Sequence, residues 1–391
     1  MSPSPYRAVA LASALGALFC VSTATESSAQ SAACTFPAAM AATPEETAWR
    51  LFVAASCPTS AGHMVWEGWI EQLQFYPATA GGTAGAPSAK RLHGSPLARV
   101  QSARAQGLRV QLAPNTECNE MRGPPSNVIT GATICEEARL NPEAAAFITT
   151  AGYQVRTAQM AAAQNKTDIE FTKPSIEVKV DWIPASDFSP PFTCDSPPAG
   201  VHVETIEGQC YAMAGMHISS KLVDKWLWAT FEPQSMLTNP LRCVTFGACN
   251  DAWGSNPATS TGGQAGFTQL TPALQDLMTQ AKLGPEFLNY RLDGVQIDFT
   301  TADGKPTFLG NSVIEGENVG MKKDEASCIT CHSVSSIKTD GTDGINTLNN
   351  MPGAPVGPKF VPPADWVARD FVWSLGFACP DPTQTGEQQC K

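Results

Sequence analysis

The segment Cys328-Ile329-Thr330-Cys331-His332 reads C-x-x-C-H, and the rest of the chain is best understood outward from it. Residues three positions apart are neighbours on a helix, so both thiols can face one ligand. The histidine that follows offers an imidazole nitrogen beside them. This is the attachment pattern of a c-type haem, in which Cys328 and Cys331 form thioethers and His332 is the proximal iron ligand.

Two other chemistries use a C-x-x-C pair. A thioredoxin-like redox pair would lie in a strand-helix-strand pattern, which does not surround this motif. A structural zinc site would need a second C-x-x-C or an H-x₃₋₅-H pair, and the sequence contains neither. The motif therefore favours one covalently attached haem c.

The beginning of the chain predicts export. Arg7 precedes a small, apolar run from Ala8 to Val21, and Ser27-Ser28-Ala29 is a small-residue cleavage site, so residues 1–29 form an expected signal peptide. No later stretch of about 20 apolar residues follows, so we expect no membrane span in the mature chain. The expected location is periplasmic or secreted, where c-type haem is attached in bacteria.

The net charge of the chain bears on which class of partner it binds. The chain has 36 acidic and 25 basic residues and a net charge of −11. A nucleic-acid partner is disfavoured, because such proteins present a basic surface. The expected partner is a redox protein or a small molecule.

The chain has 13 cysteines, of which Cys20 lies in the signal peptide and two belong to the haem motif. An even number of remaining cysteines in an exported protein predicts disulfides. Sequence leaves the connectivity open, and local pairing is the simplest arrangement. It gives five couples: Cys34/Cys57, Cys118/Cys135, Cys194/Cys210, Cys243/Cys249 and Cys379/Cys390.

Periodicity and capping predict an α+β fold with a β-rich central body, flanking helices and a small C-terminal cytochrome c-like haem unit. We expect a helical N-terminal region at 30–170, the β-rich body at 171–315 and the haem-binding region at 316–391. Helices are predicted from Thr43-Pro44-Glu45-Glu46, at His63–Tyr76, Asn141–Asn165, from Thr271 to Lys282 and at Ala364–Ala378. Strands are predicted at Ser175–Trp182, Tyr211–Ser219 and Trp226–Phe231, with a hairpin of Tyr290–Thr300 and Pro306–Glu315.

The distal iron ligand is open between several residues. Met351, in Asn349-Asn350-Met351-Pro352-Gly353, follows the motif and precedes the predicted last helix, so it is the first candidate. His217 on a predicted strand is the main alternative, followed by Met321, His202 and His63. An open sixth position would instead allow ligand binding.

Two further features have competing interpretations. Trp226 and Trp228 share one face of a predicted strand, where they could border the haem or simply pack in the core. Lys179 and Glu232 could form an acid and a base, but nothing in the sequence brings them together. We expect them to be surface or ion-pair residues.

Several segments together resemble a family of exported bacterial single-haem c-type cytochrome proteins. The segments are Ile176–Trp182, Met216-His217-Ile218 through Lys221, Trp226–Glu232, Asn311–Glu315, Ser327–His332, and more loosely Trp49–Phe52, Trp66–Trp69 and Asp370-Phe371. The resemblance implies one covalent haem and a mixed fold, without a defined reaction. Where relatives often carry a histidine after Thr-Phe-Glu, this chain has Pro233.

Two functions follow from these expectations. The first is electron transfer by a periplasmic mono-haem protein. The alternative is a haem enzyme, a peroxidase or small-molecule oxidase with an open distal site, which the large non-haem part of the chain favours. A ligand-sensing or scaffold role is a third, weaker interpretation.

Overall fold

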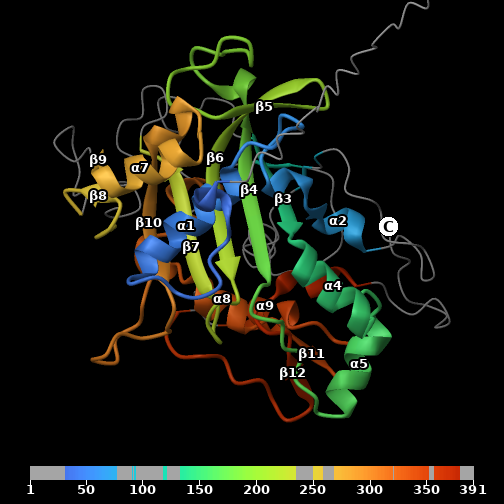
Figure 1. The fold of residues 1–391 in the computed structure, drawn as a ribbon. Helices are drawn as coiled ribbons and strands as arrows, with labels where there is room; N and C mark the ends of the chain where they lie inside the picture. Colours follow the sequence, from blue (N-terminus) through green and yellow to red (C-terminus); the bar gives the residue numbers. More distant parts are fainter. Residues whose placement is uncertain are drawn as a thin grey trace, which may run out of the picture. The chain divides into compact units, whose positions relative to one another are not determined.

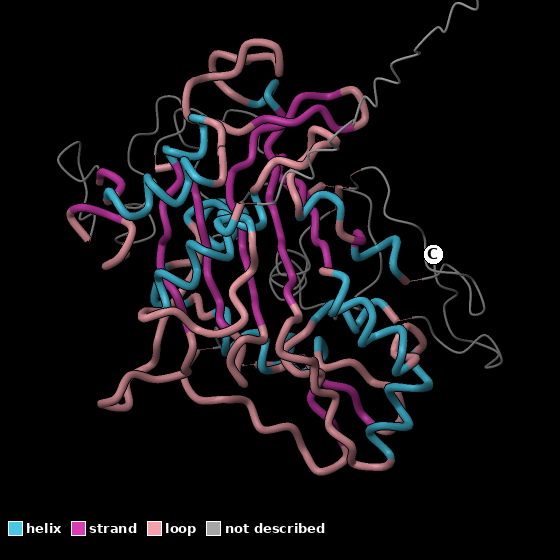
Figure 2. The backbone as a smooth tube through the Cα atoms, in the orientation of Figure 1, coloured by secondary structure: helices cyan, strands magenta, loops and turns pink. Residues whose placement is uncertain are grey.

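An antiparallel sheet is the centre of the fold, and its strands follow the order β1-β3-β4-β6-β7-β10 (Figures 1 and 2). The strands are β1 (Ile70–Glu71), β3 (Thr133–Leu140), β4 (Ile176–Pro184), β6 (Gln209–Ser220), β7 (Leu227–Pro233) and β10 (Tyr290–Gln296), with β2 (Asn119–Glu120) paired to β3 and β5 (Val203–Ile206) paired to β6.

The structure is a computed structural model, and it describes residues 31–76, 90, 92–93, 118–120, 133–234, 250–258, 268–319, 321–351 and 356–378. The expected signal peptide and the couples Cys243/Cys249 and Cys379/Cys390 lie outside the described residues. Within these ranges, no helix is both long enough and apolar enough to cross a membrane.

The helices are short. They are α1 (Pro44–Ser56), α2 (Gln72–Phe75), α4 (Pro142–Ala151), α5 (Arg156–Gln164), α7 (Pro272–Gln280), α8 (Cys328–Ser333) and α9 (Ile345–Asn350). Two small strand pairs accompany them, β8 (Ser255–Asn256) with β9 (Gln269–Leu270) and β11 (Ser336–Lys338) with β12 (Trp366–Ala368). The mixed helix and sheet content agrees with the predicted α+β class.

Alternation along the strands gives the sheet two different faces. The apolar face of β4, β6 and β7 carries Val178, Val180, Met216, Ile218, Ala229 and Phe231, which belong to one buried cluster. The polar face carries Glu177, Lys179, Asp181, His217, Ser219, Trp228 and Thr230, as the register shows: Lys179 lies opposite His217, and His217 opposite Thr230.

Helix α1 covers the apolar face. Thr43 caps it by accepting a hydrogen bond from the Glu46 amide at 3.1 Å, and Pro44 takes the first position, as the sequence predicts. The ring of Phe52 lies 4.5 Å from that of Phe231, and the Trp49 ring lies 4.9 Å from it. These fully buried rings make α1 and the sheet one hydrophobic core.

Several local predictions are confirmed. Strands β4, β6 and β7 and helix α7 occupy the expected segments. Three of the predicted disulfides are present: Cys34–Cys57, Cys118–Cys135 and Cys194–Cys210. Disulfides of this kind are typical of secreted and periplasmic proteins.

Other local predictions are wrong. The predicted hairpin forms only at its turn, where Thr300 and Pro306 make an isolated antiparallel bridge. Its second arm does not continue as a strand to residue 315, because the Asn311 side chain accepts hydrogen bonds from the amides of Val313 and Ile314 and begins a helical turn at Ser312–Asn318. The helix expected at 141–165 breaks at Gly152, whose left-handed φ of 71° ends α4.

The two remaining helix predictions also fail. At 63–76 a 3₁₀ turn, the strand β1 and the short α2 replace one helix, because β1 pairs with β3. At 364–378 the chain forms β12 and then a 3₁₀ turn at Trp373–Phe377, because β12 pairs with β11. Hydrogen bonding to a distant strand outweighs local helical periodicity in both places.

Candidate functional site

One pocket brings the C-x-x-C-H motif against the polar face of the sheet. Cys328, Cys331 and His332 of α8 line one side, and Glu177, Lys179, His217 and Trp228 line the other. The space between the two sides is partly open to solvent.

Strand β10 holds the beginning of α8. The Gln296 amide nitrogen donates to the Ser327 hydroxyl at 3.1 Å, and its oxygen accepts from the Ile329 amide at 3.2 Å. The two cysteines on this helix take no part in the three disulfides. The thiol of Cys328 lies 3.5 Å from the Leu309 carbonyl, and burial raises its pKa well above the ordinary value.

The imidazole of His332 has a defined tautomer. Its Nδ1 lies 2.8 Å from the carbonyl oxygen of Phe371. Because a carbonyl only accepts, Nδ1 carries the hydrogen and Nε2 keeps its lone pair. Burial lowers the pKa of His332 to about 3, against the opposing effect of this hydrogen bond. A neutral imidazole oriented through its other nitrogen is the usual state of a metal-binding histidine.

Aromatic rings surround His332. The Trp228 ring lies 4.4 Å from it and the Trp373 ring 6.5 Å. The indole of Trp228 donates to the Lys225 carbonyl at 3.0 Å, which fixes its orientation. Trp226 lies 6.3 Å from Trp228 but packs on Phe171 in the core. Of the two tryptophans singled out by sequence, Trp228 therefore belongs to the pocket.

The opposite wall of the pocket is a network of ionisable groups. Lys179 Nζ lies 3.4 Å from Glu136 Oε2, and His217 Nε2 lies 3.7 Å from Glu315 Oε2. Burial raises the pKa of Glu177 and of Glu315 to about 7. Burial opposes the charge of Lys179, but Glu136, Asp181 and Glu315 outweigh it and raise its pKa.

The pKa of His217 moves the other way. Burial, followed by the charge of Lys179, lowers it well below the ordinary value, so the ring is neutral. The two histidines His217 and His332 thus line one pocket although strand β6 and helix α8 carry them.

Lys179 and Glu232 are not surface residues. Lys179 lines the pocket as an ion-pair residue, and Glu232 is buried and accepts a hydrogen bond from Ser312. The charged positions Glu177, Lys179 and Asp181 alternate with Val178 and Val180, a pattern that predicts a half-buried strand. Alternation alone does not tell a solvated face from one that lines a pocket.

The candidate distal ligands differ in whether they line the pocket. His217 and Met321 line the pocket. Met351 is not among the pocket-lining residues of the described chain; it packs beside Val334, Ile345 and Leu348. As an iron ligand, Met351 stays a prediction from sequence.

Two histidines lie elsewhere. His63 donates to the neighbouring Met64 carbonyl at 2.8 Å. His202 lies 3.3 Å from Glu204 and 3.9 Å from Glu286, outside the pocket. Neither lines the pocket with His332.

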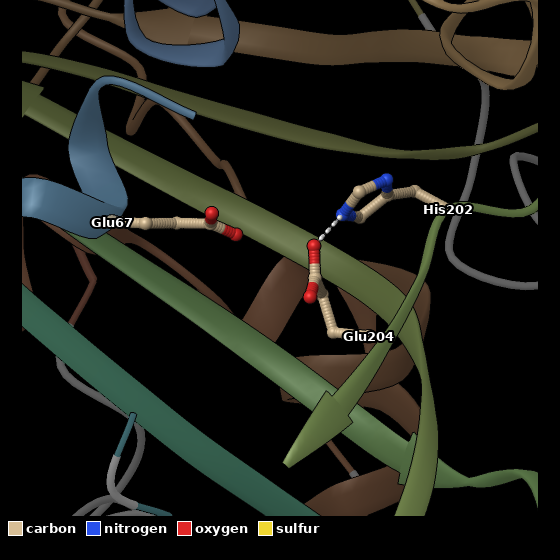
Figure 3. Close-up of side chains that lie close together, drawn as sticks. All are labelled: Glu67, His202 and Glu204. Carbon is tan, nitrogen blue, oxygen red and sulfur yellow. Dashed lines mark ion pairs between the residues drawn. The ribbon is translucent and has the colours of Figure 1, made fainter. Parts of the chain in front are cut away.

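His202 belongs to a second cluster, in which one ligand atom each of Glu67, His202 and Glu204 lie within 4.8 Å of one another (Figure 3). A cation is already supplied there by the chain. Lys90 Nζ lies 2.6 Å from Glu67 Oε1 and 4.4 Å from the centre of the Trp182 ring. The cluster is therefore explained by the Lys90 ammonium, without a metal ion.

No protein-family model, curated protein or solved structure matches the chain.

Proposed function

We propose that the chain is an exported protein that binds one haem c through Cys328, Cys331 and His332 and transfers electrons in the periplasm. The observation that carries the proposal is the hydrogen bond from His332 Nδ1 to the Phe371 carbonyl, 2.8 Å long, in a pocket shared with both cysteines. It leaves Nε2 as the basic nitrogen of a neutral, oriented ring, which is what an iron ligand requires.

The surrounding residues fit such a group. Cys328 and Cys331 would supply the thioethers and His332 the proximal nitrogen, while Leu309, Ile345 and Leu348 give the pocket an apolar part. When bound, haem iron supplies a one-electron couple. The chain's own residues hold the His332 ring beside Trp228 and Trp373, and His217 gives the pocket a second neutral imidazole.

Attachment is tested first. Protein produced in an export strain with haem-maturation machinery should keep its red colour after acid-acetone extraction. The double variant Cys328→Ala/Cys331→Ala should lose incorporation completely, whereas His202→Ala, a histidine outside the pocket, should retain it. Extractable haem, or none in the wild type, would contradict the proposal.

Ligation separates electron transfer from the second candidate, a haem enzyme. That candidate is favoured by Lys179, Glu177 and Glu315, which place buried ionisable groups along the pocket. Ferric and ferrous absorption spectra of the wild type should be low-spin for an electron carrier. A high-spin wild type that binds cyanide rapidly would favour the enzyme.

The variants then identify the distal ligand. A low-spin spectrum lost in His217→Ala and kept in Met351→Ala and Met321→Ala would assign His217. Loss of a thioether charge-transfer band in Met351→Ala would assign Met351 instead. His202→Ala is the matched control and should leave every band in place.

A further inference from the structure

The turn that presents the Phe371 carbonyl to His332 has an unusual backbone. Asp370 has φ of 48° and Phe371 has φ of 70°, so two successive non-glycine residues are left-handed. This conformation is uncommon, above all for a bulky residue such as phenylalanine. It persists only where the surrounding structure holds it, which happens most often at functional sites.

The turn is attached to the end of α8. The Arg369 amide donates to the Ser335 carbonyl at 2.9 Å, and the Ser335 hydroxyl donates to the Val372 carbonyl at 2.9 Å. These two bonds bracket Asp370 and Phe371. The position of the Phe371 carbonyl relative to His332 is therefore set by this short segment, residues 369–372.

A buried ion pair holds Asp370 in the middle of this segment. Lys221 Nζ donates to Asp370 Oδ1 at 2.7 Å, and their side chains are only 3% and 7% exposed. Asp370 Oδ2 accepts from the Phe171 amide at 2.8 Å, while Lys221 Nζ also donates to the Asp224 carbonyl at 2.9 Å. Burying two charges is costly, so such a pair is weak evidence of stabilisation and suggests another role.

We propose that the Lys221–Asp370 ion pair positions the proximal ligand. It keeps Asp370 and Phe371 left-handed, which directs the Phe371 carbonyl at His332 Nδ1 and sets how basic Nε2 is. Lys221 and Asp370 are thus positioning residues, acting on iron only through His332. The inference rests on the proposed haem site and adds a tuning element contributed by the loop after β6.

The expected direction follows from ligand chemistry. A strong hydrogen bond from Nδ1–H makes the Nε2 lone pair a stronger ligand for iron, which favours ferric over ferrous iron. Weakening this hydrogen bond should therefore raise the midpoint reduction potential of the haem iron. Loss of the group that hydrogen-bonds to a metal ligand typically changes metal affinity about 10–100-fold. A tenfold change between the two oxidation states corresponds to about 59 mV for one electron.

The test compares Asp370→Asn, Lys221→Met and the double variant Lys221→Met/Asp370→Asn with the conservative Lys221→Arg, each as the exported holoprotein. Asparagine tolerates a left-handed backbone, so Asp370→Asn removes the charge and little else. All three charge-removing changes should raise the potential, and Lys221→Arg should return it towards the wild-type value. The double variant also leaves no unpaired buried charge, since Glu170, the other carboxylate near Lys221 at 3.8 Å, is 69% exposed, and this separates tuning from misfolding.

Glu137→Gln is the matched control. It breaks the buried pair with Arg139, 2.8 Å long and 0–1% exposed, on the apolar face of the sheet. It should lower stability and leave the potential unchanged. A potential unmoved in Asp370→Asn and in the double variant, or moved as much in Glu137→Gln, would overturn the inference while the haem proposal stands.

The geometry can also be tested without relying on haem. Nitrogen-15 spectra of the histidine side chains should show the Nδ1–H tautomer of His332 in wild-type protein isolated from a strain lacking haem maturation. In Asp370→Asn the tautomers should mix. If no haem ever attaches, this readout still decides: an unchanged single tautomer would refute the positioning role, and a mixture would support it independently of the cofactor.

Discussion

The two faces of the central sheet are formed by the same strands, but one packs in the hydrophobic core and the other lines the pocket. On the apolar face, Val178, Ile218 and Ala229 stand in register and pack with α1. On the polar face, Lys179, His217 and Thr230 stand in register one residue away. A single-residue step along each strand thus separates the hydrophobic core from the wall of the pocket.

Charges on the two faces differ in how they are satisfied. On the apolar face, Glu137 accepts from Arg139 at 2.8 Å and from the Trp182 indole at 3.2 Å, and Arg139 donates to the Trp69 carbonyl at 2.5 Å. On the polar face, both carboxyl oxygens of buried Asp181 lack a hydrogen-bond partner among the described residues, whereas Glu71 on the apolar face lacks one at a single oxygen and accepts from the Gln74 amide at 2.9 Å with the other. Burial raises the pKa of Asp181 well above its ordinary value, because a carboxyl without such partners is costly to ionise.

The largest expected effect is on the apolar face. Phe52→Ala should lower the free energy of unfolding by about 3–5 kcal/mol, because the ring is fully buried against Phe231 and Trp49. Denaturant unfolding measures the loss. Under the proposed haem binding, the absorption spectrum of the folded variant should match that of the wild type. A changed ligation spectrum would show that the two faces are not independent.

The next effect concerns pH and a buried carboxyl of the apolar face. Burial raises the pKa of Glu71 from 4.5 to about 7. The folded chain therefore binds a proton that the unfolded chain has released, and this carboxyl's contribution to stability is full below pH 4.5 and declines until about pH 7. At about 1.4 kcal/mol per pH unit the decline is roughly 3 kcal/mol.

Glu71→Gln should remove that decline. The difference in unfolding free energy between pH 5 and pH 8 should be smaller in the variant than in the wild type, by about 2–3 kcal/mol. Asp276→Asn, on the exposed side of α7, is the control and should keep the wild-type difference. Equal pH profiles for wild type and Glu71→Gln would contradict the expectation.

The smallest effect on stability is expected on the polar face. His217→Ala should change the free energy of unfolding by about 1 kcal/mol or less, because its side chain lines a pocket partly open to solvent instead of filling a packed core. Chemical denaturation beside Phe52→Ala gives the comparison. A loss as large as that of Phe52→Ala would mean that the polar face is a structural core as well.

Some of the fold could be predicted because the signals are local. Thr43 and Pro44 begin α1 through contacts within one turn, and the alternation around Val178 is a property of strand β4 alone. Cys34 and Cys57 are close in sequence, so local pairing was the simplest expectation. Local signals failed where a distant partner intervened, as when β12 paired with β11 in place of the expected helix.

The candidate site divides in the same way. The spacing of Cys328, Cys331 and His332 predicts that they act as one unit, because their chemistry depends on residues within a single helical turn. That His217 and Lys179 line the same pocket follows from tertiary packing, since β4 and β6 must present that face to α8. The same holds for the Phe371 carbonyl, 39 residues from His332, and for the bond between Lys221 and Asp370, 149 residues apart. Contacts over such separations depend on how the whole chain packs, and no local pattern of residues encodes them.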